Sequence, residues 1–82
     1  MTRDQINEKV NEIFQDVFDD KNIVVNNETT SSDVEDWDSF SHMTLISEIE
    51  SEFGINFDMK DVVGMKNVGE MQDIIDKKTN NK

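Results

Sequence analysis

The sequence contains no cysteine and no proline, and it has only one histidine. Without cysteine there can be no disulfide framework, no thiolate zinc site and no cysteine nucleophile. A single histidine leaves little scope for a transition-metal site, so we expect no bound metal. Apolar runs are also short, far below the roughly 20 residues that a membrane-spanning helix needs. The first residues lack the apolar stretch of a signal peptide, so we expect a cytoplasmic location.

Basic residues are scarce as well. Eight Lys and Arg stand against 19 Asp and Glu, which gives a formal net charge of −11. Nucleic acids and anionic membrane surfaces would repel such a chain, so neither is expected as a partner. No Lys or Arg occurs from residue 22 to residue 59, where nine acidic residues lie. Because apolar residues are interspersed among these acids, we interpret the stretch as a folded face for basic partners.

The length of 82 residues fits one small domain. We expect this domain to span residues 1–82 as a monomer, with an ordered core at about 3–77 and a frayed tail at 78–82.

Apolar residues at spacings of three and four predict two long helices in the first two thirds of the chain. The first covers 2–18. The second covers 39–53, with Asp38 as its N-cap and Gly54 as its left-handed end. The residues of these helices expected to face the core are Ile6, Val10, Ile13, Phe14, Val17, Phe18, Phe40, Met43, Leu45, Ile46, Ile49 and Phe53.

In the last third of the chain, the sequence pattern predicts a short helix over 58–63 and a final helix that begins after Asn67. Glu70 follows Asn67 at the spacing of a capping box. Four methionines are expected, by their spacing, to lie chiefly in the core: Met43, Met59, Met65 and Met71. The fold class is therefore all-α, a small four-helix bundle with three main helices, one short helix and a long first loop.

The long loop, residues 19–38, is polar and has no sustained periodicity. Connections of this length are unusual in a compact domain and often have a function. We expect Trp37 to pack as a lid over the core where the loop meets the second helix. Four aliphatic residues are expected to hold the loop against the core: Ile23, Val24, Val25 and Val34.

Ser39 is the most informative candidate site residue. If Asp38 is the N-cap, Ser39 opens the helix beside the unpaired backbone N–H groups of the first turn. A phosphate on its hydroxyl would be stabilised there, so the position suits a phosphodiester. A serine at a helix start is also common without any function, so spacing alone does not decide between the two interpretations.

The sequence around Ser39 resembles the acyl carrier protein family. In that family an Asp-Ser-Leu motif opens a helix that ends in an acidic and aromatic stretch such as Glu-Glu-Phe-Gly. The matching residues of this chain are Asp38, Ser39, Phe40, Met43, Leu45, Ile49, Glu50, Glu52, Phe53 and Gly54. The resemblance implies that Ser39 carries 4′-phosphopantetheine, derived from coenzyme A, whose thiol holds acyl groups as thioesters. It also implies a carrier with no enzymatic activity of its own.

The implied partners are a phosphopantetheinyl transferase and the enzymes that load and process the acyl group through basic docking patches. We expect Asp38 to help position the modifying enzyme. The docking residues are expected to include Asp36, Glu48, Glu50 and the surface residue His42, and the acidic face is expected to include Glu52 and Asp58. The candidates to line an acyl pocket are Met43, Ile46 and Phe57.

The cargo stays open between fatty acyl, polyketide or specialised-metabolite intermediates and D-alanyl or aminoacyl groups. Phe40 replaces the usual leucine of the motif, as in D-alanyl carriers, whereas Trp37 and a nearby histidine resemble carriers of specialised pathways. The alternative from another class is an acidic interaction module that is never modified on Ser39.

Two enzymatic or metal-binding alternatives are disfavoured. A hydrolase would need His42 as the base for Ser39, but adjacent helix turns rarely give that hydrogen bond and no oxyanion hole is visible. An EF-hand loop starting at Asp20 or Asp33 would lack Gly at its sixth position and Glu at its twelfth.

Overall fold

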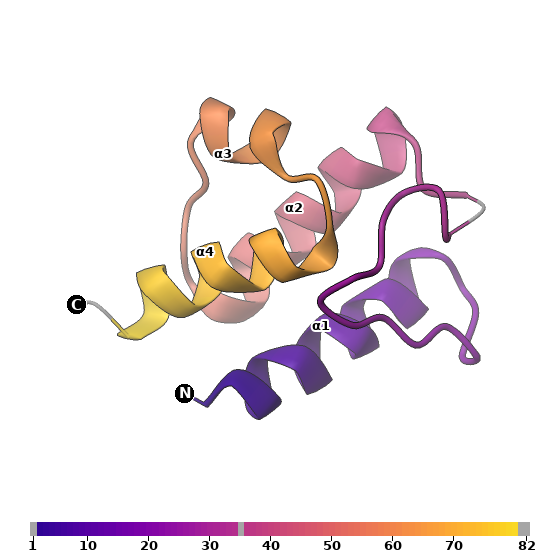
Figure 1. Ribbon diagram of the computed structural model, residues 1–82, viewed down its shortest axis with the longest axis horizontal. Coiled ribbons are helices and arrows are strands. Elements are labelled where there is room, and N and C mark those ends of the chain that lie inside the picture. The colour runs from indigo at the N-terminus through magenta and orange to yellow at the C-terminus, as the bar shows by residue number, and fades with distance from the viewer. Residues whose placement is uncertain (1, 35, 81–82) are drawn as a thin grey trace.

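The computed structural model describes residues 2–34 and 36–80. The helices in this part of the chain are α1 (Arg3–Val17), α2 (Ser39–Phe53), α3 (Met59–Gly64) and α4 (Val68–Asn80). They form the all-α bundle with a long first loop that the sequence predicts (Figure 1). None of the helices in the described ranges is long and apolar enough to cross a membrane.

Local capping groups set the helix boundaries. Thr2 caps α1, because its hydroxyl accepts a hydrogen bond from the backbone N–H of Gln5 at 3.2 Å. Asp38 caps α2 as predicted, and Gly54 closes that helix in the left-handed conformation with φ of 65°. Left-handed backbone is open to glycine without steric cost, which fixes the end of α2 at this residue.

The start of α4 differs from the predicted capping box in one contact. The side chain of Asn67 accepts from the backbone N–H of Glu70 at 2.8 Å, as expected. The Glu70 carboxylate, however, accepts from the backbone N–H of Lys66 rather than from that of Asn67. At its other end α4 continues to Asn80, past the expected end of the ordered core, and the Thr79 hydroxyl donates to the carbonyl of Ile75 at 2.8 Å.

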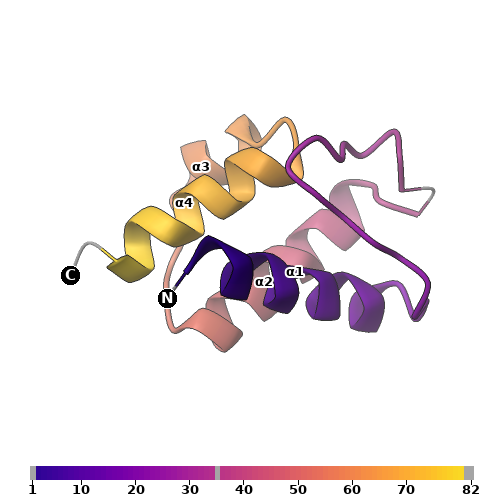
Figure 2. The ribbon, with the colours of Figure 1, turned by 60° about the horizontal axis from the view of Figure 1, so that its bottom comes forward.

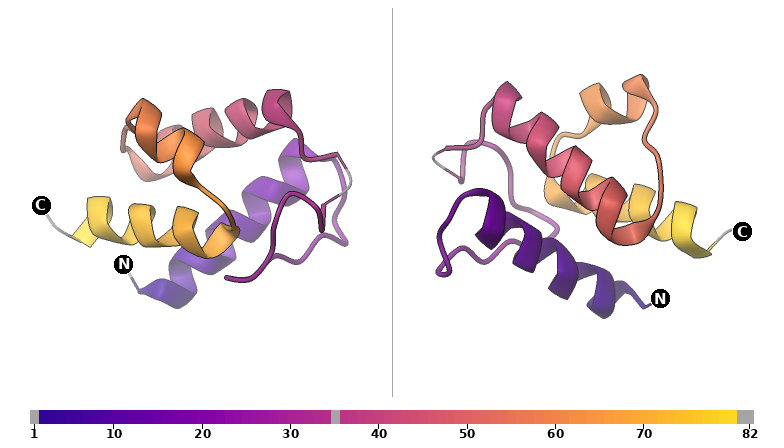
Figure 3. Two further views of the ribbon diagram at one scale, coloured as in Figure 1. Left: turned by 45° about the horizontal axis from the view of Figure 1, so that its top comes forward. Right: turned by 180° about the vertical axis from the view of Figure 1, so that it is seen from behind.

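The core lies between α1, α2 and α4, while α3 stands at the edge of the bundle (Figure 3). Tight packing of aliphatic side chains around Phe14 excludes water from this space and supplies most of the stability of a small bundle. In the described part of the chain, the fully or almost fully buried apolar side chains are Ile6, Val10, Phe14, Val25, Leu45, Ile49, Val68, Met71 and Ile75.

The prediction of which α2 residues face the core was wrong for Phe40 and Met43. Their exposed fractions are 85% and 53%, and Met59 of α3 is exposed as well. Leu45, Ile46 and Ile49 are buried, as expected. The reason is that Leu45 and Ile49 join the core cluster with side chains of α1 and α4, whereas Phe40 and Met43 lie outside this cluster.

The first loop is held to the helices by side-chain and backbone hydrogen bonds. The amide of Asn11 donates to the carbonyl of Val25 at 3.0 Å and accepts from its N–H at 2.6 Å. Val25 and Val34 are buried and Ile23 is partly buried, as expected, but Val24 is exposed, so the prediction for that residue was wrong.

The loop also pairs with the start of α4, which the sequence did not predict. The backbone N–H of Val68 donates to the carbonyl of Thr29 at 2.8 Å, and that of Gly69 donates to the carbonyl of Asn27 at 3.0 Å. Figure 2 shows the loop running from the end of α1 to the start of α4 before it turns to α2. The loop therefore delivers its last residues, 36–38, to the N-terminal end of α2.

Candidate functional site

Ser39 is the first residue of α2 and is exposed to solvent. The preceding cap is reciprocal: the Asp38 carboxylate accepts from the backbone N–H of Ser41 at 2.9 Å, and the Ser41 hydroxyl accepts from the N–H of Asp38 at 2.8 Å. The hydrogen bond from the Ser41 backbone lowers the pKa of the Asp38 carboxyl below its usual value. The cap is therefore ionised at neutral pH and holds the start of α2 in place.

A pocket of about 460 Å³ opens beside Ser39, between the end of the first loop, α2 and α3. Its wall is largely aliphatic and aromatic, with a few polar groups at the rim. The residues that line it are Ser31, Trp37, Asp38, Ser39, His42, Met43, Val62, Val63, Met65 and Lys66.

The predicted acyl-pocket residues are only partly brought together. Met43 lines the pocket beside Ser39, whereas Ile46 and Phe57 lie outside its wall. Val62 and Val63 also line the pocket and were not predicted from the sequence. The signal that could have identified them is that they form an apolar pair in an otherwise polar short helix.

His42 is not a free surface residue, which corrects the prediction from the sequence. It is half-buried, and both of its ring nitrogens have partners within the chain. The indole N–H of Trp37 donates to Nδ1 at 3.1 Å, and Nε2 lies 3.2 Å from the carbonyl oxygen of Val62. His42 nevertheless lines the pocket beside Ser39, so its expected proximity to that serine holds.

Trp37 packs as the lid that the sequence predicts. Its ring meets that of Phe14 edge-on with centroids 5.1 Å apart, and it stacks against His42 at 5.9 Å. Edge-to-face aromatic pairs of this kind are favourable beyond the area that they bury. Trp37 therefore joins the end of the first loop to α1 and α2 directly behind Ser39.

The predicted acidic docking residues have different surroundings. Asp36 and Glu48 are exposed. Glu50 is half-buried, and its carboxylate accepts from the backbone N–H of Phe57 at 2.8 Å, so it stabilises the turn after α2 rather than standing free for a partner.

Glu52 has a basic neighbour that the sequence could not reveal. The ammonium of Lys9 on α1 lies 2.9 Å from its carboxylate, and this partner raises the pKa of Lys9. The lack of Lys and Arg from residue 22 to residue 59 therefore does not leave this carboxylate without a basic neighbour. Asp36, which precedes α2, and Glu48, which lies on it, are exposed, so their docking role stays a prediction.

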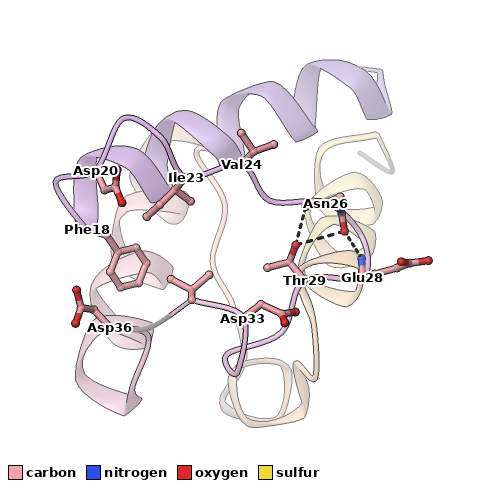
Figure 4. A pocket seen from close by; sticks show the side chains of 10 residues that line it. Phe18, Asp20, Ile23, Val24, Asn26, Glu28, Thr29, Asp33 and Asp36 are labelled. Carbon is pink, nitrogen blue, oxygen red and sulfur yellow. Dashed lines mark hydrogen bonds between the residues drawn. The ribbon is translucent and has the colours of Figure 1, made fainter.

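A second pocket, of about 580 Å³, lies within the first loop and does not include Ser39. Its side chains are shown in Figure 4, where Phe18 and Ile23 lie on one side and several carboxylates lie at the rim. Hydrogen bonds of Asn26 with Glu28 and Thr29 stabilise the turn in this part of the loop (Figure 4). Among the described residues there is no group of three or more His, Asp or Glu that could hold a metal ion.

Comparison with known proteins gives consistent results for family and structure. The family model described as the phosphopantetheine attachment site matches residues 8–75. The fold is similar to the solution NMR structure of a holo acyl carrier protein from Geobacter metallireducens, with a TM-score of 0.85 and 40% sequence identity. That match covers 90% of this chain and 85% of the other. In the comparison with curated proteins, no sequence matches significantly.

Proposed function

Because this chain belongs to the family of phosphopantetheine-attachment carrier domains, we propose that Ser39 is the residue that bears its 4′-phosphopantetheine and that the arm carries an acyl group. The family and the fold both identify a non-catalytic carrier with this prosthetic group. We further propose that residues 1–82 form one carrier domain and that the protein acts in the cytoplasm.

The observation that carries the choice of Ser39 is its position. The serine is exposed at the first position of α2, where the positive end of the helix dipole favours a negatively charged phosphodiester. The reciprocal hydrogen bonds between Asp38 and Ser41 define the start of this helix, so the Ser39 hydroxyl lies at its first position, open to an incoming enzyme. The residues present therefore fit a phosphate ester.

The pocket beside Ser39 is suited to an apolar chain. When it is attached, the prosthetic group supplies a terminal thiol to which an acyl group can be joined as a thioester. We propose that Met43 and the aliphatic residues Val62, Val63 and Met65 form the surface on which such a chain can shelter from water. Methionine suits this role because its flexible side chain adapts to ligands of different shape.

The partners proposed for this carrier are a phosphopantetheinyl transferase and the enzymes that load and process the acyl group. The exposed carboxylates of Asp36 and Glu48 lie before and along α2 and are proposed to meet basic patches on these enzymes. The cargo class that we propose is an acyl intermediate of fatty acid, polyketide or specialised-metabolite synthesis. The alternative cargo is a D-alanyl or aminoacyl group, which the motif residue Phe40 favours by resemblance.

Mass spectrometry tests the attachment site. The full chain is incubated with a phosphopantetheinyl transferase and coenzyme A, and it should gain the mass of one phosphopantetheine group. The Ser39→Ala variant should gain none. A matched control is Ser47→Ala, which changes another exposed serine of α2 and should be modified like the original chain. If the Ser39→Ala variant is still modified, or the original chain is never modified beside a converting control carrier, the proposal is wrong.

A further inference from the structure

The hydrogen bonds of His42 define its protonation state. The indole N–H of Trp37 can only donate, so Nδ1, which lies 3.1 Å away, must be without a proton. The carbonyl of Val62 can only accept, so Nε2, at 3.2 Å, must carry the proton. His42 is therefore a neutral imidazole of one tautomer in this structure, and its ring joins the end of the first loop to α3.

Helix α3 depends on few contacts for its position. None of its six residues is buried. The polar contacts that reach it from other helices, in the described part of the chain, are the one from His42 to Val62 and an ion pair between Lys78 and Asp61 at 3.9 Å. The ion pair is long and partly exposed, so its contribution is small. The imidazole is thus a main tie between α2 and α3.

The same tie sets one wall of the pocket beside Ser39. Trp37, His42 and Val62 all line that pocket, which lies between α2 and α3. A change in the distance between the His42 ring and the Val62 carbonyl therefore changes the width of the pocket.

We infer that neutral His42 is a positioning residue that holds α3 over the pocket beside Ser39, and that a proton on Nδ1 releases α3. Protonation places two N–H groups against each other where one donor and one acceptor met before. The ring must then turn away from the indole of Trp37. Because both nitrogens belong to one rigid ring, this turn also moves Nε2 away from the carbonyl of Val62.

The charged groups around His42 do not replace the lost acceptor. The charged residues that line its pocket are Asp38 and Lys66, which carry opposite charges. The Asp38 carboxylate already accepts from the helix start, and on α3 the Asp61 carboxylate is paired with Lys78. None of these contacts therefore offers Nδ1 a new acceptor once it carries a proton.

For a carrier, release of α3 would open the pocket and expose the cargo. This consequence rests on the proposed function, whereas the tie itself involves only side chains of the unmodified chain. Mild acidification would then shift the acyl group from shelter in the pocket toward the solvent.

The test uses NMR of the full-length, unmodified protein between about pH 8 and about pH 5. Two quantities are followed: the signal of the Trp37 indole N–H, and the hydrogen-exchange protection of the α3 amides after correction for the intrinsic pH dependence of exchange. On acidification the indole signal should shift, and α3 protection should fall roughly threefold to tenfold, as expected for the loss of one hydrogen bond. Protection of α1 should stay constant.

Two variants separate this mechanism from general acid sensitivity. His42→Gln retains one acceptor and one donor without titrating, so α3 protection should be independent of pH. Trp37→Phe keeps an aromatic ring against Phe14 but removes the indole N–H, so the pH dependence of α3 protection should be largely lost. The inference is overturned if α3 protection in the original chain does not change with pH, or if the His42→Gln variant shows the same fall. Neither result affects the test of Ser39, which relies on mass.

Discussion

At the scale of single residues, Gly69 shows how closely the first loop approaches α4. Its N–H donates to the carbonyl oxygen of Asn27, and a Cβ atom at Gly69 would lie 2.6 Å from that same oxygen. Real Cβ atoms do not come this close to a backbone oxygen, so the loop would have to move away. No local pattern marks this glycine, because the close approach exists only after the chain has folded.

Replacement of Gly69 by alanine should therefore destabilise the protein. We expect Gly69→Ala to lower the free energy of unfolding by about 1–3 kcal/mol, measured by urea denaturation. The matched control is Gly64→Ala at the end of α3, where no atom lies within 4 Å of the added Cβ. That variant should be unchanged or more stable by up to about 1 kcal/mol. Equal losses in both variants would show that the loop does not constrain Gly69.

The cap residue Asp38 makes a pH-dependent contribution whose sign follows from its pKa. Because the folded state lowers the pKa of this carboxyl, its contribution is complete above the pKa of the unfolded chain. It is lost as the pH falls through the lower pKa of the folded chain. An asparagine at this position can still accept from the N–H of Ser41 but does not titrate.

Melting temperatures measured from neutral pH down to about pH 3 test this contribution. Asp38→Asn should melt close to the original chain at neutral pH, and its melting temperature should fall less steeply below about pH 4. The other carboxylates are common to both proteins, so the difference between the two curves isolates position 38. Parallel curves would contradict the assigned role.

At the scale of elements, the ends of α2 were predictable, whereas its buried face was predicted only in part: Leu45, Ile46 and Ile49 are buried as expected, but Phe40 and Met43 are exposed. Asp38 and Gly54 act through local hydrogen bonds and backbone conformation, which the sequence displays directly. Apolar residues, in contrast, lie on more than one side of α2, and both Phe40 and Leu45 fit a helical spacing. Which side is covered depends on where α1 packs, and this is a property of the whole fold.

The candidate site also has features that the sequence predicts and features that it does not. The position of Ser39 at a helix start was predictable, because the cap and the motif that mark it are local. The tie from Trp37 through His42 to Val62 was not, because it needs α3 to return beside α2. Likewise the partners of Glu50 and Glu52 come from other segments, so the sequence alone made both look free.

The corrected face of α2 gives a contrast between two large apolar residues. We expect Leu45→Ala, at a fully buried position, to lower the free energy of unfolding by about 2–5 kcal/mol. Phe40→Ala removes more atoms but from a side chain that is 85% exposed, so its effect should stay within about 0.5 kcal/mol. Denaturant unfolding measures both. A large loss from Phe40→Ala with a small one from Leu45→Ala would contradict the burial of Leu45 and the exposure of Phe40.

At the scale of the whole molecule, the net charge of −11 is distributed so that some carboxylates serve the fold and others face outward. Glu52 is neutralised by Lys9, and Glu50 holds the turn after α2. Asp36 and Glu48 remain exposed near the helix that begins at Ser39. For the basic partners proposed above, these carboxylates would supply an electrostatic field that accelerates the encounter with Ser39.

With Ser39 as the proposed attachment site, such a field predicts that its modification is sensitive to salt. The screening length falls from about 10 Å at 0.1 M salt to about 3 Å at 1 M, so the initial rate of phosphopantetheine transfer should fall severalfold over this range. Glu48→Gln should lower the rate at low salt and flatten its salt dependence. The control is Asp4→Asn in the first turn of α1, at the opposite end of the bundle from the start of α2 (Figure 1), and it should leave both unchanged. A rate that is indifferent to salt would show that charge does not govern the encounter. A rate that drops equally in both variants would show that total charge, rather than this acidic surface, governs it.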